Sequence, residues 1–203
     1  ADKVKEKKTK LSQDWTSIAI FASIKTFLSM KSTQLLPRID CFIPSGTEAD
    51  CTALSQSLQA DSFVNHIFQL IPEGSQASFC EGQLPIKNMF STETLKAIGE
   101  HSEADYCLIY FKNLPLTLGY HALERLIQVA DDTNAVMVYA DHYAIMNGER
   151  CNKPLIDYQA GSLRDDFDFG SLVLIRTECL KAYLKQENVN NYQFAGWYDF
   201  RLF

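Results

Sequence analysis

The chain has 203 residues, of which 46% are hydrophobic and 22% are charged, as is typical of a soluble globular domain with a well-filled core. Its formal net charge is -6 at pH 7, which argues against a nucleic-acid partner because phosphate binding normally requires a basic face. The six cysteines are far apart and form no CxxC pair, so we expect a reduced, cytoplasmic protein without a disulfide framework or a zinc site.

The N-terminal 36 residues are predicted to form a separate amphipathic helical segment. Basic residues lie between Lys3 and Lys10, and the apolar stretch WTSIAIFASIKTFL is interrupted by Lys25 and by several hydroxyl groups. The stretch is shorter than the roughly 18 to 20 apolar residues of a membrane span, and it lacks the A-x-A cleavage pattern of a signal peptide. We predict a helix that starts at Asp14, with contact at a membrane surface as the alternative.

Residues 37–203 alternate between short apolar runs, which predict strands, and segments with the apolar spacing of helices. The predicted strands are IDCFIP (39–44), HIFQLI (66–71), YCLIYF (106–111), AVMVYA (135–140) and SLVLI (171–175). The side chains predicted to cap helices are Ser45, Ser91 and Thr117, and ECLKAYLK (178–185) predicts a further helix. Between 142 and 170 we expect a long connection or a short hairpin. Four strand and helix units in series predict an α/β fold with a doubly wound, mostly parallel sheet.

Ligands of open α/β sheets bind beyond the carboxyl ends of the strands, so the residues that follow the predicted strands are the first candidates for a site. These residues are Pro44-Ser45, the turn 72–75, Lys112-Asn113 and Asp141-His142. The first strand is not followed by GxGxxG, and the chain has no GxxxxGK[ST] motif and no local signature of Ser-His-Asp or Cys-His catalysis. The remaining classes bind a nucleotide or a sugar without a glycine-rich loop.

Five segments resemble, in order, the landmarks of the family-2 glycosyltransferases with a GT-A fold. They are IDCFIPSGTEADCTALSQSL, FQLIPEGS, YCLIYFKNLPLTLGYHALERL, AVMVYAD and WYDFRL. The first is similar to the family's V-I-P-x-Y-N segment, the second to its V-D-D-G-S turn and the last to the E-D-x-x-L-W-x-R segment that holds the catalytic base. The resemblance covers residues 39 to 202. It implies an inverting glycosyltransferase that transfers a sugar from a nucleotide diphosphate-sugar, with UDP as the expected nucleotide.

The resemblance also implies a glycan or lipid-linked acceptor, as in polysaccharide biosynthesis, and roles for individual residues. Pro44, Ser45, Glu73 and Asp141 fall at donor-binding positions, and Asp199 falls where the family places its general base. The structural alternatives are that Glu73 is a solvated turn carboxylate and that Asp199 pairs with Arg201. The acceptor-binding candidates are Tyr158, Trp197 and Tyr198, because aromatic rings can stack on sugars, although buried aromatic anchors would give the same pattern.

The third predicted strand departs from the family, which has there an Asp-x-Asp motif that binds Mg²⁺ or Mn²⁺. Here Lys112 and Asn113 follow the strand, so the usual metal ligands are absent. Lys112, together with Arg164, could supply the positive charge for the diphosphate. Alternatively a metal ion is held elsewhere, for which the candidates are Asp141, His142, Asp165, Asp166 and Asp168. A third alternative is a non-catalytic GT-A-like binding or scaffold module, and a nucleotidyltransferase is a fourth.

The chain ends directly after the predicted base, whereas further helices normally close the acceptor side in this family. We therefore expect a domain that is truncated at its C-terminus or that docks on a partner or on the inner face of the membrane.

Overall fold

The computed structural model describes residues 36–75, 82–159 and 167–203, and the compact unit within it runs from Pro37 to Phe203. The predicted N-terminal helix lies outside the described residues, so the division of the chain at residue 36 stays a prediction. In the part of the chain that is described, no helix is long and apolar enough to cross a bilayer.

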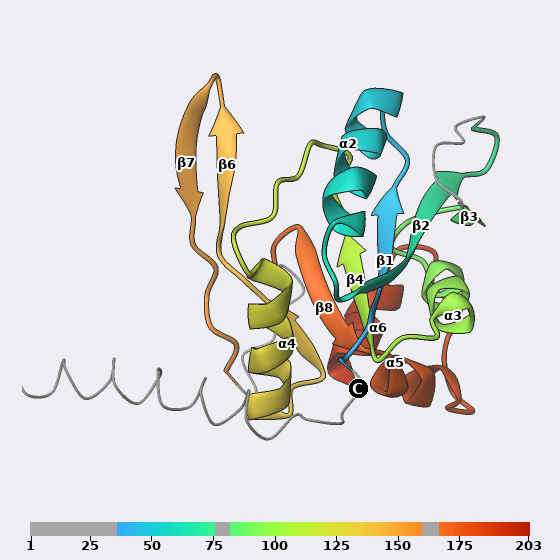
Figure 1. The fold of residues 1–203 in the computed structure, drawn as a ribbon. Helices are drawn as coiled ribbons and strands as arrows, with labels where there is room; N and C mark the ends of the chain where they lie inside the picture. The colour runs from blue at the N-terminus through green and yellow to red at the C-terminus, as the bar shows by residue number, and fades with distance from the viewer. Residues whose placement is uncertain (1–35, 76–81, 160–166) are drawn as a thin grey trace, which may run out of the picture. The chain divides into compact units, whose positions relative to one another are not determined.

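A six-stranded sheet forms the centre of this unit (Figure 1). Its strands, in spatial order, are β3 (Gly82–Ile86), β2 (Val64–Pro72), β1 (Ile39–Pro44), β4 (Tyr106–Tyr110), β8 (Leu172–Arg176) and β5 (Met137–Tyr139). The pairs among β3, β2, β1 and β4 are parallel, and β8 runs antiparallel between β4 and β5. The predicted doubly wound, mostly parallel α/β fold is therefore confirmed.

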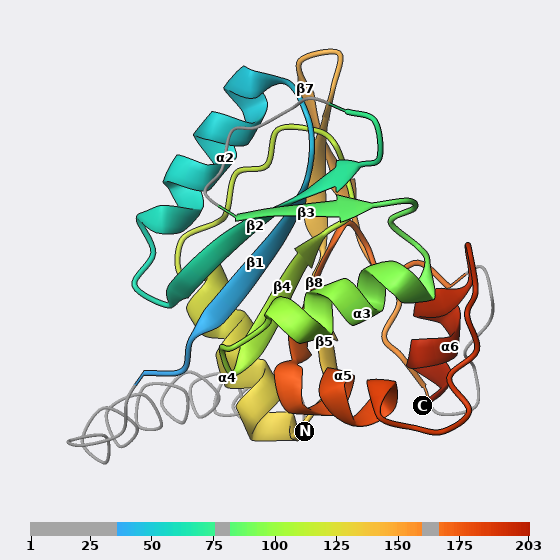
Figure 2. The ribbon, with the colours of Figure 1, turned by 90° about the vertical axis from the view of Figure 1, so that its right-hand side faces the viewer.

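Five helices cover the two faces of the sheet (Figure 2). They are α2 (Glu48–Gln59), α3 (Thr92–His101), α4 (Ala122–Thr133), α5 (Thr177–Leu184) and α6 (Gly196–Leu202). Helices α2 and α4 pack on one face together with Ile39, Cys41 and Ile43 of β1, whereas α3, α5 and α6 pack on the other together with Phe42. Because both faces of β1 are covered, the strand is apolar apart from Asp40.

Two helices do not start at the residues that were predicted to cap them. Ser91 caps α3 as predicted, but α2 is capped by Thr47, two residues after the expected Ser45, and the Thr47 side chain accepts from the Asp50 amide. Thr117 does not cap α4, which starts only at Ala122. The residues before α4 are extended because Pro115 disfavours a helical residue before it, and apolar side chains of this extended segment pack on the core.

The connection between β5 and β8 contains the expected short hairpin. Strands β6 (His142–Met146) and β7 (Glu149–Lys153) form a separate two-stranded antiparallel sheet. Asn147 and Gly148 between them both have positive φ, of 53° and 83°, which is the backbone of the tight turns that match the twist of a hairpin. Strand β3 was not predicted, because Pro85 interrupts its pattern; a proline is compatible with this strand since β3 is at the edge of the sheet.

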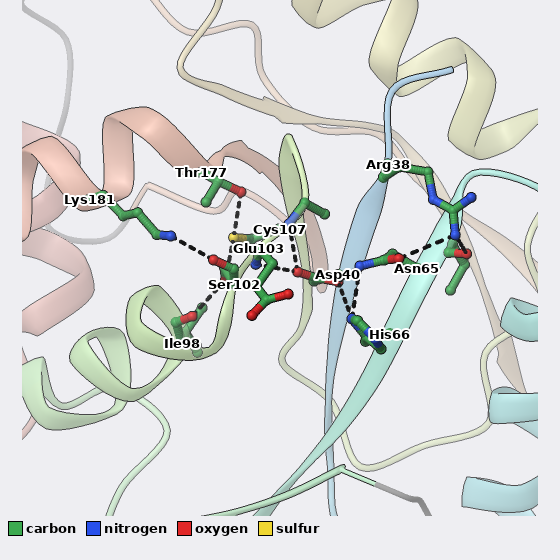
Figure 3. Close-up of polar contacts among 12 residues, drawn as sticks. Arg38, Asp40, Asn65, His66, Ile98, Ser102, Glu103, Cys107, Thr177 and Lys181 are labelled. Atoms are coloured by element: carbon green, nitrogen blue, oxygen red, sulfur yellow. Dashed lines mark hydrogen bonds and ion pairs between the residues drawn. The ribbon is translucent and has the colours of Figure 1, made fainter. Parts of the chain in front are cut away.

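A buried carboxylate organises the amino edge of the sheet, where the parallel strands begin (Figure 3). Asp40 is fully buried in β1, and its Oδ2 accepts hydrogen bonds from the amides of Glu103 at 2.7 Å and Ala104 at 2.9 Å. Its Oδ1 accepts from Asn65 Nδ2 at 3.0 Å and lies 3.3 Å from His66 Nδ1. Buried charges are tolerated when they are hydrogen-bonded in this way, so Asp40 ties β1 and β2 to the segment that enters β4.

A second group of polar contacts continues this edge towards α5. Ser102, which ends α3, donates to the Ile98 carbonyl at 2.6 Å and lies 3.0 Å from Cys107 Sγ, and Thr177 Oγ1 lies 3.2 Å from the same sulfur. Lys181 Nζ donates to the Ser102 carbonyl at 2.7 Å. Burial raises the pKa of Cys107, so its thiol stays protonated and has a structural role. We name the residues Asp40, Asn65, His66, Ser102, Cys107, Thr177 and Lys181 the amino-edge cluster.

Candidate functional site

A cavity of about 270 Å³ opens at the opposite, carboxyl edge of the sheet, on the face that α3, α5 and α6 cover. The ends of β4 and β5 meet there, because Tyr110 pairs with Leu172 and Tyr139 with Val173 at the start of β8. The cavity is lined by Phe90, Phe111, Lys112, Met137, Phe167, Asp168, Phe169, Gly170, Val173, Trp197 and Arg201. We call it the aromatic cavity. It lies where ligands of open α/β sheets bind.

The aromatic walls of this cavity are packed against one another. Phe90 and Phe111 stack with their ring centroids 5.9 Å apart, and Trp197 meets Phe111 edge-on at 4.9 Å. Phe167 and Phe169 form a second pair, with centroids 4.6 Å apart. These stacked and edge-on geometries are the favourable ones for aromatic pairs, so the rings hold each other in position around the opening.

Helix α6 brings Trp197 to the cavity because its start is fixed to the loop before α3. Trp197 Nε1 donates to the Met89 carbonyl at 2.8 Å, and the Gly196 amide donates to the Phe90 carbonyl at 3.0 Å. A Cβ atom on Gly196 would lie 2.5 Å from the backbone nitrogen of Thr92, which is closer than real contacts allow. Only glycine therefore permits α6 to approach this closely.

Three charged residues line the aromatic cavity, and the two cations among them form no ion pair with any residue in the described ranges. Arg201 is half-buried; its Nε is buried without a hydrogen-bond partner, and one terminal nitrogen donates weakly to the Phe167 carbonyl at 3.4 Å. Burial lowers the pKa of Arg201. Lys112 follows β4, and the Oδ1 of Asp168 accepts from the Gly170 amide at 2.7 Å. Among the described residues, one exposed carboxylate and two cations line the cavity, and this set does not fit a divalent metal ion, which prefers several oxygen ligands.

Some of the predicted site residues come together at this cavity. Lys112, Asp168 and Trp197 line it. Tyr158 is exposed, with its ring centroid 6.5 Å from that of Phe167, and Tyr198 lies beside Arg201, with 5.5 Å between the guanidinium carbon and the ring centroid. The binding roles of these residues stay predictions.

Asp199 does not line the cavity. On a helix, residues four apart share a face, so Trp197 and Arg201 point into the cavity while Asp199, two positions from each, points elsewhere. Its Oδ2 accepts from the Tyr183 hydroxyl at 2.7 Å, and burial together with this bond raises the pKa of Tyr183. The expected alternative pair between Asp199 and Arg201 is not formed within the described residues. A role for Asp199 as a general base stays an untested prediction.

The donor-binding candidates at β1 and β2 lie at the same edge but outside the aromatic cavity. Pro44 lines a small neighbouring hollow together with Lys112, and the Ser45 amide donates to the Leu70 carbonyl at 2.9 Å. Glu73 is exposed, and its amide donates to the Ile86 carbonyl at 2.9 Å. Lys112 is therefore the predicted residue that faces both hollows.

The metal candidates do not form a cluster in the part of the chain that the structure describes. Asp141 Oδ1 accepts from the Leu155 amide at 2.7 Å, and His142 starts β6 with a buried Nδ1 that has no hydrogen-bond partner. Arg164, Asp165 and Asp166 lie outside the described residues. Among the described residues, no three His, Cys, Asp or Glu side chains come close enough to share an ion. A Mg²⁺ or Mn²⁺ site stays a prediction.

Several residues that line the aromatic cavity were not predicted from the sequence. Phe90 and Phe111 were not identified as site residues, and Arg201 was considered only as a partner of Asp199. The helical spacing of Trp197 and Arg201 was a usable signal, since it places both side chains on one face. The contact of α6 with the loop before α3 could not be predicted, because it joins residues about 100 positions apart in the chain.

No protein-family model and no curated protein sequence matches the chain. Among solved structures it is similar to 4-diphosphocytidyl-2C-methyl-D-erythritol synthase from Anaerococcus prevotii, with a TM-score of 0.41 and 10% identity over 80% of this chain and 84% of that chain. It is also similar to 2-C-methyl-D-erythritol 4-phosphate cytidylyltransferase from Thermus thermophilus, with a TM-score of 0.42 and 11% identity over 83% of this chain and 84% of that chain. At this level of similarity no residue role is transferred.

These comparisons contradict the predicted glycosyl transfer. The two solved structures are cytidylyltransferase-type enzymes, so the prediction of an inverting glycosyltransferase in polysaccharide biosynthesis was wrong and is not retained. Membership of the family-2 glycosyltransferases is likewise unsupported. The part of the resemblance that remains is the mostly parallel α/β fold with a candidate site at its carboxyl edge.

Proposed function

We propose that the chain binds a phosphorylated small molecule of the nucleotide class at the carboxyl edge of the sheet, with the aromatic cavity as the centre of the site. The observation that carries the proposal is a cavity with aromatic walls and two lining cations, Lys112 and Arg201, that form no ion pair with any described residue. Pockets for small ligands combine mostly apolar walls with a few placed polar groups, and this cavity has that composition.

The two kinds of lining residue suit the two parts of such a ligand. The aromatic walls of the cavity offer apolar surface on which a planar ring, such as a nucleobase, can pack. The ammonium group of Lys112 is a compact point charge on a flexible stem, which is well suited to a phosphate group. Its position between the aromatic cavity and the hollow beside Pro44 lets it reach a phosphate that lies over the strand ends.

Calorimetric titration of the full chain with CTP, CMP and cytidine tests the proposal, and cytidine compounds are tried first because of the names of the two similar structures. We expect CTP and CMP to bind and cytidine to bind at least tenfold more weakly. Lys112→Gln should weaken the binding of both nucleotides, whereas the exposed Lys96→Gln on α3 serves as a matched control and should not. Absence of binding by CTP, CMP and the corresponding uridine and purine nucleotides would refute the proposal.

Measuring pyrophosphate release together with binding separates a binding module from an enzyme. Release of pyrophosphate from CTP in the presence of a phosphorylated alcohol acceptor would identify nucleotidyl transfer at this site. Tight binding without release, measured both with Mg²⁺ and with EDTA, would identify a binding module. Either outcome is compatible with the proposed site, and Lys112→Gln should suppress whichever activity is found.

A further inference from the structure

We propose that the guanidinium group of Arg201 recognises a terminal phosphate, so that the aromatic cavity selects a phosphate monoester carried on a ring over a phosphodiester or an uncharged ligand. This inference rests on the proposed function and assigns the anion-selecting residue and the chemical class of the ligand at the same site. Arg201 comes from α6, a part of the chain far from the strand end that holds Lys112.

The guanidinium group of Arg201 has hydrogen-bond donors without a good acceptor among the described residues. Its guanidinium has five N–H donors, but the Nε is buried without an acceptor and the bond to the Phe167 carbonyl is long, at 3.4 Å. Desolvating a charged group is unfavourable unless it is paired and hydrogen-bonded. No carboxylate among the described residues forms an ion pair with it, so an oxyanion in the cavity would offer its terminal N–H groups an acceptor of opposite charge.

The guanidinium is already held in one orientation. Its central carbon lies 4.9 Å from the ring centroid of Phe169 and 5.5 Å from that of Tyr198, which are cation–π distances. A planar guanidinium fixed in this way presents a pair of parallel donors, and such a pair matches two oxygens of one phosphate group. A lysine at the same place would provide charge without this geometry.

The charge of the cavity favours a dianion. Lys112 and Arg201 outnumber Asp168, whose Oδ1 is already occupied by the Gly170 amide. A terminal phosphate carries a charge of about -1.5 to -2 at pH 7, and its second pKa is about 6. A phosphodiester carries one charge and two free oxygens instead of three, so its attraction to the two cations is weaker.

The size of the cavity limits the rest of the ligand. At about 270 Å³ it is at the lower end of the range for small-molecule pockets, which is roughly 300 to 1,000 Å³. It therefore encloses one ring and its phosphate, or one end of a larger nucleotide. Phenyl phosphate has this composition and is the probe of choice, with methyl phenyl phosphate as the diester and phenol as the uncharged analogue.

Titrations of these three compounds at about pH 7.5, where a phosphate monoester is mostly dianionic, test the inference. The full chain should bind phenyl phosphate and should prefer it to the diester and to phenol. Arg201→Gln should lower the affinity for phenyl phosphate by about 10- to 100-fold and abolish the preference over the diester. Arg201→Lys should recover part of the affinity but little of the preference. The matched control Arg125→Gln, on the exposed surface of α4, should bind as the unmodified chain does.

A pH series gives a readout that a merely structural role for Arg201 would not change. Lowering the pH from about 7.5 to about 5.5 protonates the phosphate of phenyl phosphate, so its binding should weaken several-fold while binding of the diester stays constant. Arg201→Gln should lose this pH dependence. The thermal unfolding midpoint of each variant, measured without ligand, establishes that the variants are folded.

The outcomes distinguish the inference from the proposed function. If Arg201→Gln keeps the full preference for phenyl phosphate, Arg201 is not the selecting residue and the inference is overturned, while nucleotide binding that depends on Lys112 would still support the proposed function. If the unmodified chain binds nucleotides but not phenyl phosphate, the assigned ligand class is wrong. If it binds no phosphorylated compound at all, the proposed function itself fails.

Discussion

At the amino edge of the sheet, the carboxylate of Asp40 is fully buried and accepts hydrogen bonds from two backbone amides and the Asn65 amide group. At the carboxyl edge, the guanidinium of Arg201 is half-buried and its Nε has no acceptor. The first charge has a full set of hydrogen bonds, whereas the second has only one weak hydrogen bond among the described residues. A satisfied buried charge fixes one structure, whereas an unsatisfied one in an aromatic cavity is suited to a ligand. Changes at the amino edge should therefore affect stability, and changes at Arg201 should affect binding.

Asp40→Ala should have the largest effect on stability. The substitution leaves the buried Ala104 amide and the partly buried Glu103 amide without an acceptor, and each unsatisfied buried group costs about 1 to 3 kcal/mol, so we expect a loss of about 3 kcal/mol in the free energy of unfolding. Urea denaturation followed by circular dichroism measures it. The exposed Asp132→Ala on α4 is the control. A loss below about 1 kcal/mol for Asp40→Ala would contradict the role given to the amino edge.

Gly196→Ala should have the second-largest effect on stability. We expect it to lower the free energy of unfolding by about 2 kcal/mol, because overpacking a close contact typically costs about 1 to 3 kcal/mol. The new methyl group would meet the backbone of Ser91 and Thr92, which cannot rotate away as a side chain could. Because α6 carries Trp197 and Arg201, nucleotide binding should weaken as well. Gly119→Ala, which meets open space, should change neither quantity. Equal stability of the two variants would show that α6 is not fixed as described.

Tyr183→Phe should cost about 1 kcal/mol, the typical net contribution of one hydrogen bond. The pKa of Tyr183 is raised by burial and by the bond to Asp199, so it exceeds that of the unfolded chain. This tyrosine therefore stabilises the fold below about pH 10, and the contribution is lost as the pH rises through the folded pKa. Unfolding measured at about pH 8 and about pH 10.5, on either side of the unfolded pKa, should show a smaller alkaline loss in Tyr183→Phe. The same alkaline loss in both proteins would exclude Tyr183 as its source.

Arg201→Leu should have the smallest effect on stability. Unlike the three substitutions above, it should not lower the free energy of unfolding. Replacing an unpaired, partly desolvated charge with an apolar side chain should leave the free energy of unfolding unchanged or raise it by about 0.5 to 1 kcal/mol. The same variant should bind phosphorylated ligands poorly. Urea denaturation and calorimetry on one preparation check both statements, and a destabilisation of about 2 kcal/mol would mean that Arg201 has a structural role like that of Asp40.

Much of the fold could be predicted because local patterns determine it. The apolar runs at β1 and β4 form strands as predicted, and Ser91 caps α3 as its position before a helical pattern suggested. The start of α4 was misplaced because Leu118 packs on the core from outside the helix but lies four residues before Ala122, so it continues the apolar spacing of the helix. Strand β3 was hidden by Pro85, which only an edge strand tolerates.

The site was less predictable, because it depends on contacts between distant segments. The rule that ligands lie beyond the carboxyl ends of parallel strands drew attention to Lys112, which lines the aromatic cavity. The sequence could not show that Phe90 and Trp197 would meet Phe111, or that Asp199 would bond to Tyr183 and so face away from the cavity. The family resemblance then assigned the reaction from short motifs, and the comparison with solved structures did not support that assignment.

Fluorescence of Trp197 provides the most direct test of the central claim that phosphorylated ligands bind in the aromatic cavity. The chain has two tryptophans, and Trp15→Phe leaves Trp197, which lines the cavity, as the single emitter. We predict that CMP and phenyl phosphate change the emission of Trp197 in a saturable way, with the same dissociation constant as calorimetry, and that Arg201→Gln abolishes the change produced by phenyl phosphate. Calorimetric binding of either compound without any change in the emission of Trp197 would contradict the claim and place the site elsewhere.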